Sequence, residues 1–228
     1  DYMQMAGRAG RQGIDDEGLV ISIMDDEDLD DAPLADLFGG KVEPIVSKFN
    51  MSYSTILNLY EHLGGQLMEA YDQSFAAFQA ATGSKKKRDK IRNRERSALR
   101  ARLQILTDAG YLNQDGLLPR GRLACKINGY EIQVTELMFG GVLDQMDMHQ
   151  LAATFTGLVH EERRRDSTPG SERNVLGSLS RDVEKAIGRF VNLELRAGFE
   201  HPIKQASFAI AAATDAWSRG ASVEKVEY

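Results

Sequence analysis

The chain has 228 residues, of which 42% are hydrophobic and 27% charged, so it holds material for one or two folded domains with a real core. Its single cysteine, Cys125, excludes an internal disulfide framework and suits a reducing cytoplasm, where we expect the protein. The net charge of −6 argues at first against a nucleic-acid partner, and no apolar stretch approaches membrane-spanning length, so no membrane partner is expected.

The chain opens on the segment Q-M-A-G-R-A-G-R-Q-G, residues 4–13. Arg8 and Arg11 are three residues apart, so a helical turn would place both on one side, where they could hold a polyphosphate or a carboxylate in forked fashion. Gly7 and Gly10 lack a Cβ atom and would let the backbone approach a ligand or a facing domain. The spacing alone also fits arginines that merely pair with acidic neighbours on a solvated helix.

A tight acidic turn and a short apolar run follow. Residues 15–18 read D-D-E-G, and residues 19–24 read L-V-I-S-I-M. The apolar run predicts a buried strand. The start of the chain is therefore expected to be a helix that carries arginines, a turn and a core strand.

The pattern Q-x-x-G-R-x-G-R, followed by G-I-D-D-x-G and an apolar run, resembles motif VI of superfamily 2 helicases and is nearest to the superkiller-type DExH-box RNA helicases. The resemblance implies a RecA-like α/β domain in which Gln4, Arg8 and Arg11 face ATP held by a partner domain. It implies a catalytic role for both arginines and cofactor binding by Gln4, Gly7 and Gly10. An arginine supplied from another domain can neutralise the charge that builds up during phosphoryl transfer.

Two further ATPase motifs do not occur in these residues. The chain contains neither a G-x-x-x-x-G-K-[ST] phosphate loop nor a D-E-x-[DH] metal-binding strand. We therefore expect no ATPase activity from this chain alone, with ATP and Mg²⁺ bound mainly by amino-terminal domains that it lacks. The first residue, an aspartate and not a methionine, agrees with a fragment of a longer helicase.

An acidic loop and a linker containing Pro33 and Gly39-Gly40 precede the next folded part. Ser52 is expected to cap a helix that ends at Gly64-Gly65, and a second helix is expected to follow. Residues 47–59 resemble the start of the winged-helix domain of the same helicases. The positions expected to face inward are Tyr53, Ile56, Leu57, Tyr60 and Leu63 in the first helix, and Leu67, Met68, Tyr71, Phe75 and Phe78 in the second.

A basic tract at residues 85–102 is expected to form a long helix. It carries ten Lys or Arg residues against Asp89 and Glu95, a local charge of +8, so the rest of the chain sums to about −14. The tract could lie along an RNA backbone and release counterions, or it could be a solvated charged connection. No aromatic residue lies within it, so base stacking there is not expected.

Residues 103–123 are typical of the end of a winged helix. A helix closing at Ala109-Gly110, a strand from Tyr111, a turn at Asp115-Gly116 and a return strand predict a small β-hairpin. Such a wing either reads nucleic acid or packs between domains as a brace. We favour the brace.

Residues 119–127 and 135–141 are similar to the opening of the helical DSHCT domain of the superkiller-type helicases. Arg120, Arg122 and Lys126 are candidate RNA-backbone contacts, although surface salt bridges explain them as well. Cys125 is interpreted as a packing residue, because no catalytic partner can be named for it.

The remaining residues predict helices with apolar faces and a loop at residues 168–171. The four histidines show no ligand spacing, so no metal site is expected. The expected core stripes are Met148, Leu151, Phe155, Leu158 and Val159; Leu179, Val183, Ala186, Ile187 and Phe190; and Ile203, Ala206, Ile210, Ala213 and Trp217.

The fold class expected is mainly α: a remnant of a RecA-like α/β domain (1–32), a winged helix with a small β-hairpin and a basic connecting helix (33–118), and an incomplete DSHCT-like helical bundle (119–228). The resemblance implies the carboxy-terminal part of an ATP-dependent 3′ to 5′ RNA helicase acting in RNA processing or decay. Its implied partners are single-stranded RNA and the missing RecA-like domains, with a nuclease complex left open. The alternatives are a DNA helicase of the related archaeal type, or a stand-alone winged-helix module that binds nucleic acid or protein.

Overall fold

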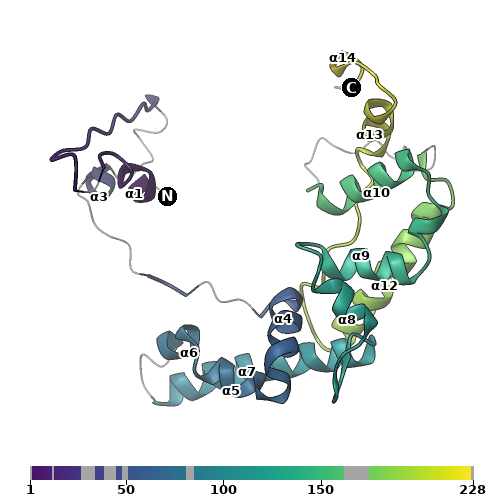
Figure 1. The fold of residues 1–228 in the computed structure, drawn as a ribbon, viewed down its shortest axis with the longest axis horizontal. Coiled ribbons are helices and arrows are strands. Elements are labelled where there is room, and N and C mark those ends of the chain that lie inside the picture. The colour runs from purple at the N-terminus through teal and green to yellow at the C-terminus, as the bar shows by residue number, and fades with distance from the viewer. Residues whose placement is uncertain are drawn as a thin grey trace. The chain divides into compact units, whose positions relative to one another are not determined.

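The computed structural model describes residues 2–11, 13–26, 34–38, 45–47, 51–80, 85–161 and 175–226 (Figure 1). The chain divides into two compact units, residues 1–47 and 48–228. The described part is mainly helical, as expected, with one two-stranded sheet. The expected linker at Gly39-Gly40 and the loop at 168–171 lie outside the described residues.

The described residues of the first unit include the short helices α1 (Tyr2–Ala6) and α3 (Leu34–Phe38). The rings of Tyr2 and Phe38 meet edge to face, with 5.7 Å between their centroids. The expected buried strand at residues 19–24 is wrong, because this segment pairs with no strand in the described residues and Ile23 is 95% exposed. A strand needs a hydrogen-bonding neighbour and a covered face, and the described residues of this unit supply neither.

The second unit begins with four helical segments: α4 (Tyr53–Leu63), η1 (Gly64–Gln66), α5 (Leu67–Asp72) and α6 (Phe75–Ala80). The Ser52 Oγ accepts a hydrogen bond from the Thr55 N–H at 3.2 Å, which confirms the expected cap. The single helix expected next is instead broken after Asp72, and the Ser74 Oγ accepts the Ala77 N–H at 3.2 Å. The break changes the helical phase, so Phe75 and Phe78 are 50% and 70% exposed, not inward.

The basic tract forms α7 (Lys85–Asp108), as expected. The helix closes where Gly110 takes φ +76° and the Tyr111 N–H reaches back to the Leu106 carbonyl at 2.8 Å. A β-hairpin of β1 (Leu112–Asn113) and β2 (Gly116–Leu117) follows, with Leu112 opposite Leu117. The hairpin expected here is thus present, although its assignment to a winged helix stays a prediction.

The rest of the unit is helical: α8 (Pro119–Ala124), α9 (Glu131–Phe139), η2 (Leu143–Gln145), α10 (Met148–Val159), α12 (Leu179–Arg196), α13 (Ala211–Ser218) and α14 (Val223–Val226). Asp147 and Gln150 form a reciprocal capping box at the start of α10. Within the described residues, no helix is both long and apolar enough to cross a membrane.

The three expected core stripes have different outcomes. The stripe on α12 is confirmed, since Val183, Ile187 and Phe190 are buried. The α10 stripe is only partly confirmed: Leu158 is buried, but Met148, Phe155 and Val159 are exposed, because the buried face also includes the smaller residues Ala153 and Gly157. The third stripe is not one helix: α13 starts only at Ala211, so Ile203 and Ala206 precede it, and Trp217 is 65% exposed.

Phe190 of α12 lies at the centre of the core that joins the early and late parts of the second unit. Its ring meets Tyr53 of α4 edge to face at 5.0 Å and Tyr111 at 5.8 Å between centroids. The same buried cluster contains Leu99 of α7 and Ile132 of α9. Residues on both sides of position 118 therefore share one core, while the domain limits at 32 and 118 stay predictions.

Candidate functional site

The two amino-terminal arginines lie in a tight loop and not on a helix, because α1 ends at Ala6. Arg11 pairs with Asp15 through Nε to Oδ2 at 3.0 Å and Nη2 to Oδ1 at 3.1 Å. This contact raises the pKa of Arg11 and lowers that of Asp15. Arg8 is exposed, and its side chain has no hydrogen bond or ion pair with any described residue. The structure thus pairs Arg11 with an acidic neighbour and leaves Arg8 open to solvent.

The expected cofactor residues Gln4, Gly7 and Gly10 are also exposed. Gly10 takes φ +79°, and the loop returns so closely that a Cβ on Gly18 would lie 2.4 Å from the Ala9 carbonyl oxygen. Gly18 is therefore a residue that the sequence reasoning missed: it lets the loop close and present the arginines. Its place at the end of the G-I-D-D-x-G pattern was the available signal.

The three candidate RNA contacts have unequal surroundings. Arg120 is committed to the fold: its Nη1 lies 2.6 Å from Glu136 Oε1, and its guanidinium lies 4.7 Å from the centroid of the Phe139 ring. Arg122 is exposed, although its Nε donates to the Leu117 carbonyl at 3.1 Å. Lys126 is exposed just after α8. Arg122 and Lys126 thus remain open to a ligand, while Arg120 fastens α8 to α9.

Two buried glutamates, which the sequence reasoning missed, hold the tyrosines that flank Phe190. The Tyr53 hydroxyl donates to Glu194 Oε1 at 3.0 Å, and the Tyr111 hydroxyl donates to Glu136 Oε1 at 2.9 Å. Burial raises the pKa of both phenols well above the usual range, so the hydroxyls stay protonated and donate. Burial also raises the pKa of Glu194, against the hydrogen bonds from Ile203 and Tyr53.

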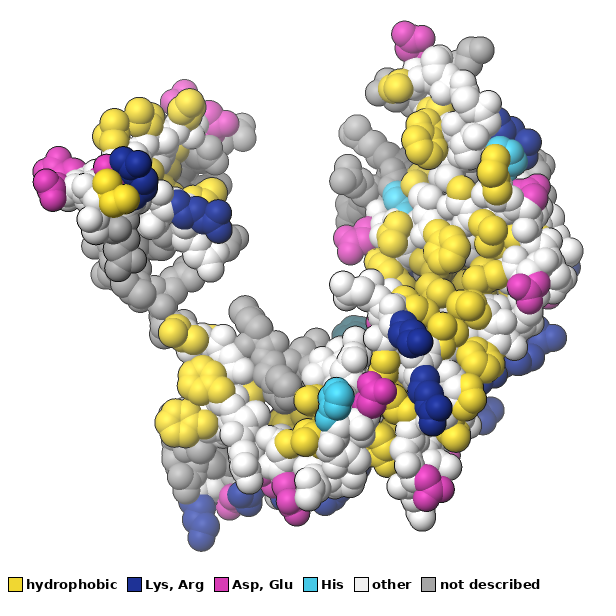
Figure 2. Space-filling view, viewed as in Figure 1, with side chains coloured by type: hydrophobic (Ala, Val, Ile, Leu, Met, Phe, Trp, Pro, Cys, Tyr) yellow, Lys and Arg dark blue, Asp and Glu magenta, His cyan; other side chains and the backbone are white. Residues whose placement is uncertain are grey.

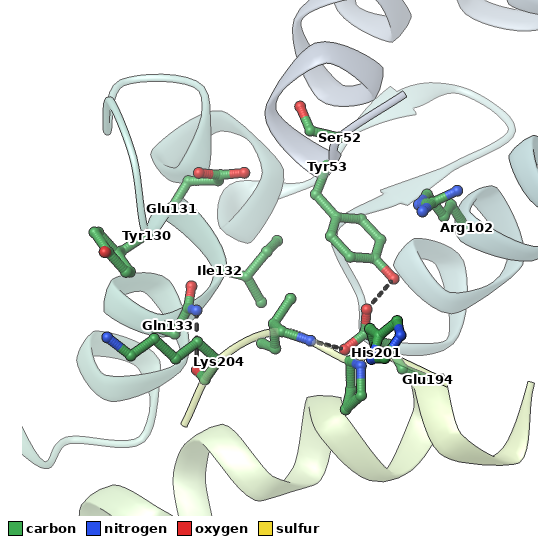
Figure 3. Close-up of a pocket in the computed structure, with 12 residues that line it drawn as sticks. Ser52, Tyr53, Arg102, Tyr130, Glu131, Ile132, Gln133, Glu194, His201 and Lys204 are labelled. Atoms are coloured by element: carbon green, nitrogen blue, oxygen red, sulfur yellow. Dashed lines mark hydrogen bonds between the residues drawn. The ribbon is translucent and has the colours of Figure 1, made fainter. Parts of the chain in front are cut away.

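An open pocket of about 320 Å³ lies beside this tyrosine–glutamate pair (Figure 3). Arg102 stacks over Phe199 at 4.8 Å, and Gln133 Nε2 donates to the Lys204 carbonyl at 3.1 Å. The Lys204 ammonium donates to the His160 carbonyl. The pocket is lined by Ser52, Tyr53, Arg102, Tyr130, Glu131, Ile132, Gln133, Glu194, His201, Pro202, Ile203 and Lys204.

Three hydrogen bonds within the lining, Tyr53 to Glu194, Ile203 to Glu194 and Gln133 to Lys204, connect early and late parts of the unit, so the pocket lies where these parts pack together. Among its described lining residues, no hydrogen bond joins a Ser or Cys nucleophile to a general base. Cys125, outside the pocket, has its thiol pKa raised by burial, which opposes reactivity. Among the residues that the structure describes, no group of His, Cys, Asp or Glu is arranged to hold a metal ion.

Residues 114–227 match the DSHCT (NUC185) domain family, and the chain belongs to this family. The chain is 44% identical over 81 residues to the DExH-box ATP-dependent RNA helicase DExH10 of Arabidopsis thaliana, which is 35% of this chain and 8% of that protein. It is 36% identical over 97 residues to the human exosome RNA helicase MTR4, covering 42% of this chain and 9% of that protein.

A third relative, the ATP-dependent RNA helicase mtr4 of Schizosaccharomyces pombe, is 46% identical over 59 residues, covering 26% of this chain and 5% of that protein. The matches thus span less than a tenth of each relative's own length. They support the expected likeness to the carboxy-terminal region of superkiller-type helicases. The assignments of motif VI and of the winged helix stay predictions.

Proposed function

We propose that this chain is the carboxy-terminal part of an ATP-dependent RNA helicase that unwinds or feeds RNA with 3′ to 5′ polarity in cytoplasmic RNA processing or decay. The match of residues 114–227 to the DSHCT family carries the proposal, and relatives of the same region are named ATP-dependent RNA helicases. One relative is named an exosome RNA helicase, which makes a nuclease complex the natural candidate partner.

The amino-terminal loop would complete a nucleotide site in the whole protein. Arg8 and Arg11 would stabilise charge on the transferring phosphoryl group, with Gln4, Gly7 and Gly10 beside the nucleotide. ATP and Mg²⁺ would be held mainly by RecA-like domains outside these residues. The solvent exposure of Arg8 supports this role. The Arg11–Asp15 pair is also exposed, and such pairs are weak enough to exchange for a phosphate.

The helices of the second unit would line the path of the RNA. Arg122 and Lys126 are the open cations near α8, and the Arg120–Glu136 contact fixes the helix that carries them. Arg120, expected as an RNA contact, would therefore act by positioning α8. In this proposal the RecA-like remnant, winged helix and DSHCT-like bundle keep the limits 1–32, 33–118 and 119–228.

The decisive experiment measures RNA-stimulated ATP hydrolysis and duplex unwinding by the full-length protein and by its Arg8→Ala and Arg11→Ala variants. Each variant should lose about 10³-fold or more in kcat, the range of a missing arginine finger, while RNA affinity stays unchanged. Arg122→Gln with Lys126→Gln should instead weaken RNA binding and lower the salt slope by about 1.4 for a single strand.

Three outcomes would overturn parts of the proposal. Unwinding of DNA but not RNA duplexes would favour the archaeal-type DNA helicase. Binding without ATP hydrolysis would favour a stand-alone module. Hydrolysis by the pure 228-residue chain would contradict its dependence on other domains.

A further inference from the structure

The first half of α7 carries a row of cations on one face of the helix. Lys86, Lys90 and Arg94 follow one another at intervals of four residues, and Arg100 lies near the same face. All four side chains are exposed. The row rises by about 21 Å along the axis, at 1.5 Å per residue. Figure 2 shows Lys and Arg side chains projecting from the lower edge of the unit, along which α7 runs in Figure 1.

These four cations have no anionic partner in the described part of the chain. The carboxylates nearby serve other arginines: Asp89 pairs with Arg92 at 3.5 Å, and Asp72 of α5 pairs with Arg96 at 3.2 Å. Asp89 lies three residues after Lys86, at the edge of the row, and already pairs with Arg92, whereas Glu95 lies on the opposite side of the helix. The face therefore presents four cations to solvent beside a single carboxylate that serves another arginine.

This charge distribution opposes helix formation. Like charges four residues apart repel, and cations near a helix amino terminus meet the positive end of its dipole. The first turn of α7 contains no acidic residue that would offset this. Since neither packing nor capping requires these side chains, an anionic ligand is the simplest physical reason for them.

The shape and chemistry of the face favour a nucleic-acid duplex as that ligand. Single-strand sites combine cations with aromatic rings on which bases stack. α7 itself contains no Phe, Tyr or Trp, and the exposed rings on the neighbouring α6, Phe75 and Phe78, stack on each other. A duplex hides its bases and presents rows of phosphates, which lysine and arginine can contact without base stacking. A helix of 24 residues, about 36 Å long, can follow such a surface.

We propose that Lys86, Lys90, Arg94 and Arg100 on α7 bind the phosphodiester backbone of a nucleic-acid duplex. This site shares no residue with the nucleotide loop or with Arg122 and Lys126, and the proposed binding requires neither ATP nor a RecA-like domain. It therefore stands or fails independently of the proposed helicase activity.

The test measures binding of labelled blunt RNA duplex, DNA duplex and single-stranded RNA to the 228-residue chain, between about 50 and 200 mM salt. The test variant combines Lys86→Gln, Lys90→Gln, Arg94→Gln and Arg100→Gln. The control combines Arg181→Gln, Lys185→Gln, Arg189→Gln and Arg196→Gln on α12, which removes the same charge from exposed positions, three of them also four residues apart. Helical content, measured by circular dichroism, checks the fold of both.

The test variant should bind duplex at least about tenfold more weakly at the lowest salt, and its salt slope should fall by about 3.6, or 0.9 for each lost contact. The control should change the slope by less than about 1. Exchanging Arg94 and Arg100 for lysine should retain binding, because the contact requires only positive charge. Equal binding of RNA and DNA duplexes would show that the site contacts phosphates alone. Tighter binding of RNA would show that it also contacts the 2′-hydroxyl groups.

Three results would overturn the proposal. An equal loss in the α12 control would show a general effect of charge. A larger loss for single-stranded than for duplex RNA would assign the face to a different ligand. Competition by an acidic peptide as strong as that by duplex would identify a protein-docking surface.

Discussion

The two longest helices described in the second unit, α7 and α12, are specified by different physical requirements. α12 has buried residues along its length, from Val183 through Phe190 to Glu194. α7 is longer, yet its described buried side chains, Leu99, Ile105 and Leu106, all lie in its second half. Burial thus fixes all of α12 but mainly the second half of α7, whereas the first half carries three of the four cations proposed to bind a ligand.

The two helices also differ in net charge. α12 carries four cations and three acids, a net charge of +1, whereas residues 85–102 carry +8. α12 thus carries acids along with its cations, whereas the basic tract of α7 has few acids to offset its cations. The comparison therefore separates residues that stabilise the fold from residues that destabilise it, and five predictions test this separation.

The largest effect is expected at the centre of α12. Phe190→Ala removes a ring that is 1% exposed and contacts two tyrosines, so the free energy of unfolding should fall by about 3 to 5 kcal/mol. Denaturant unfolding of the 228-residue chain measures it. Phe78→Ala, the same change at an exposed ring, should cost less than about 1 kcal/mol. Equal losses of stability in the two variants would mean that Phe190 is not central to the core that joins the early and late parts of the second unit.

The second prediction compares the two halves of α7. Leu99→Ala in the buried half should lower the free energy of unfolding by about 2 to 5 kcal/mol. Ile91→Ala in the cationic half removes a half-buried side chain and should cost about 1 kcal/mol or less. If Ile91→Ala is as damaging as Leu99→Ala, the first half of α7 is held by packing and the comparison with α12 fails.

The third prediction concerns the link from α12 to α4. Tyr53→Phe leaves the buried Glu194 with one donor fewer and should lower the free energy of unfolding by about 1 to 2 kcal/mol. Tyr60→Phe, which removes a half-buried hydroxyl bonded to the Asn113 carbonyl at 3.0 Å, should cost less. A larger loss at Tyr60 would place the main link elsewhere.

The same glutamate gives this link a pH dependence. Because burial raises the pKa of Glu194 in the folded chain, the folded state holds this proton at a pH where the unfolded chain has released it. The contribution of Glu194 to stability is therefore fully present below about pH 4, near the ordinary glutamate pKa, and is lost as pH rises through the folded value. The Glu194→Gln variant should lack this loss of stability with rising pH. If its free energy of unfolding varies with pH as in the unsubstituted chain, Glu194 does not cause the pH dependence.

Local signals in the sequence predicted local structure well. Ser52 and Gly64 mark the ends of α4, Gly110 closes α7, and the α12 stripe is buried as its period requires. Each signal acts within a few residues, where backbone geometry and helical period decide the outcome. The same reasoning misplaced Phe75 and Phe78, because the short break after Asp72 changes the phase of every later residue.

Contacts between distant residues were beyond the sequence reasoning. Tyr53 and Glu194 are 141 residues apart, and no period or spacing connects them. For the candidate site, the sequence indicated which amino-terminal residues are chemically unusual but not how Gly18 closes their loop. The buried strand failed because it depended on neighbours that the described residues of its unit do not supply.

The smallest effect gives the sharpest test of the comparison, because its sign should differ between the two helices. Lys86→Glu near the start of α7 replaces repulsion from Lys90 by attraction and complements the helix dipole. These two effects outweigh the new repulsion from Asp89, so stability should rise by about 0.5 kcal/mol. Arg196→Glu, the same charge reversal in the last turn of α12, opposes the dipole and should lower stability by a similar amount. Thermal unfolding at low salt resolves the two signs. A loss of stability in Lys86→Glu would mean that the cations of α7 serve the fold, whereas a gain together with weaker duplex binding would show residues kept for a ligand at the expense of the helix.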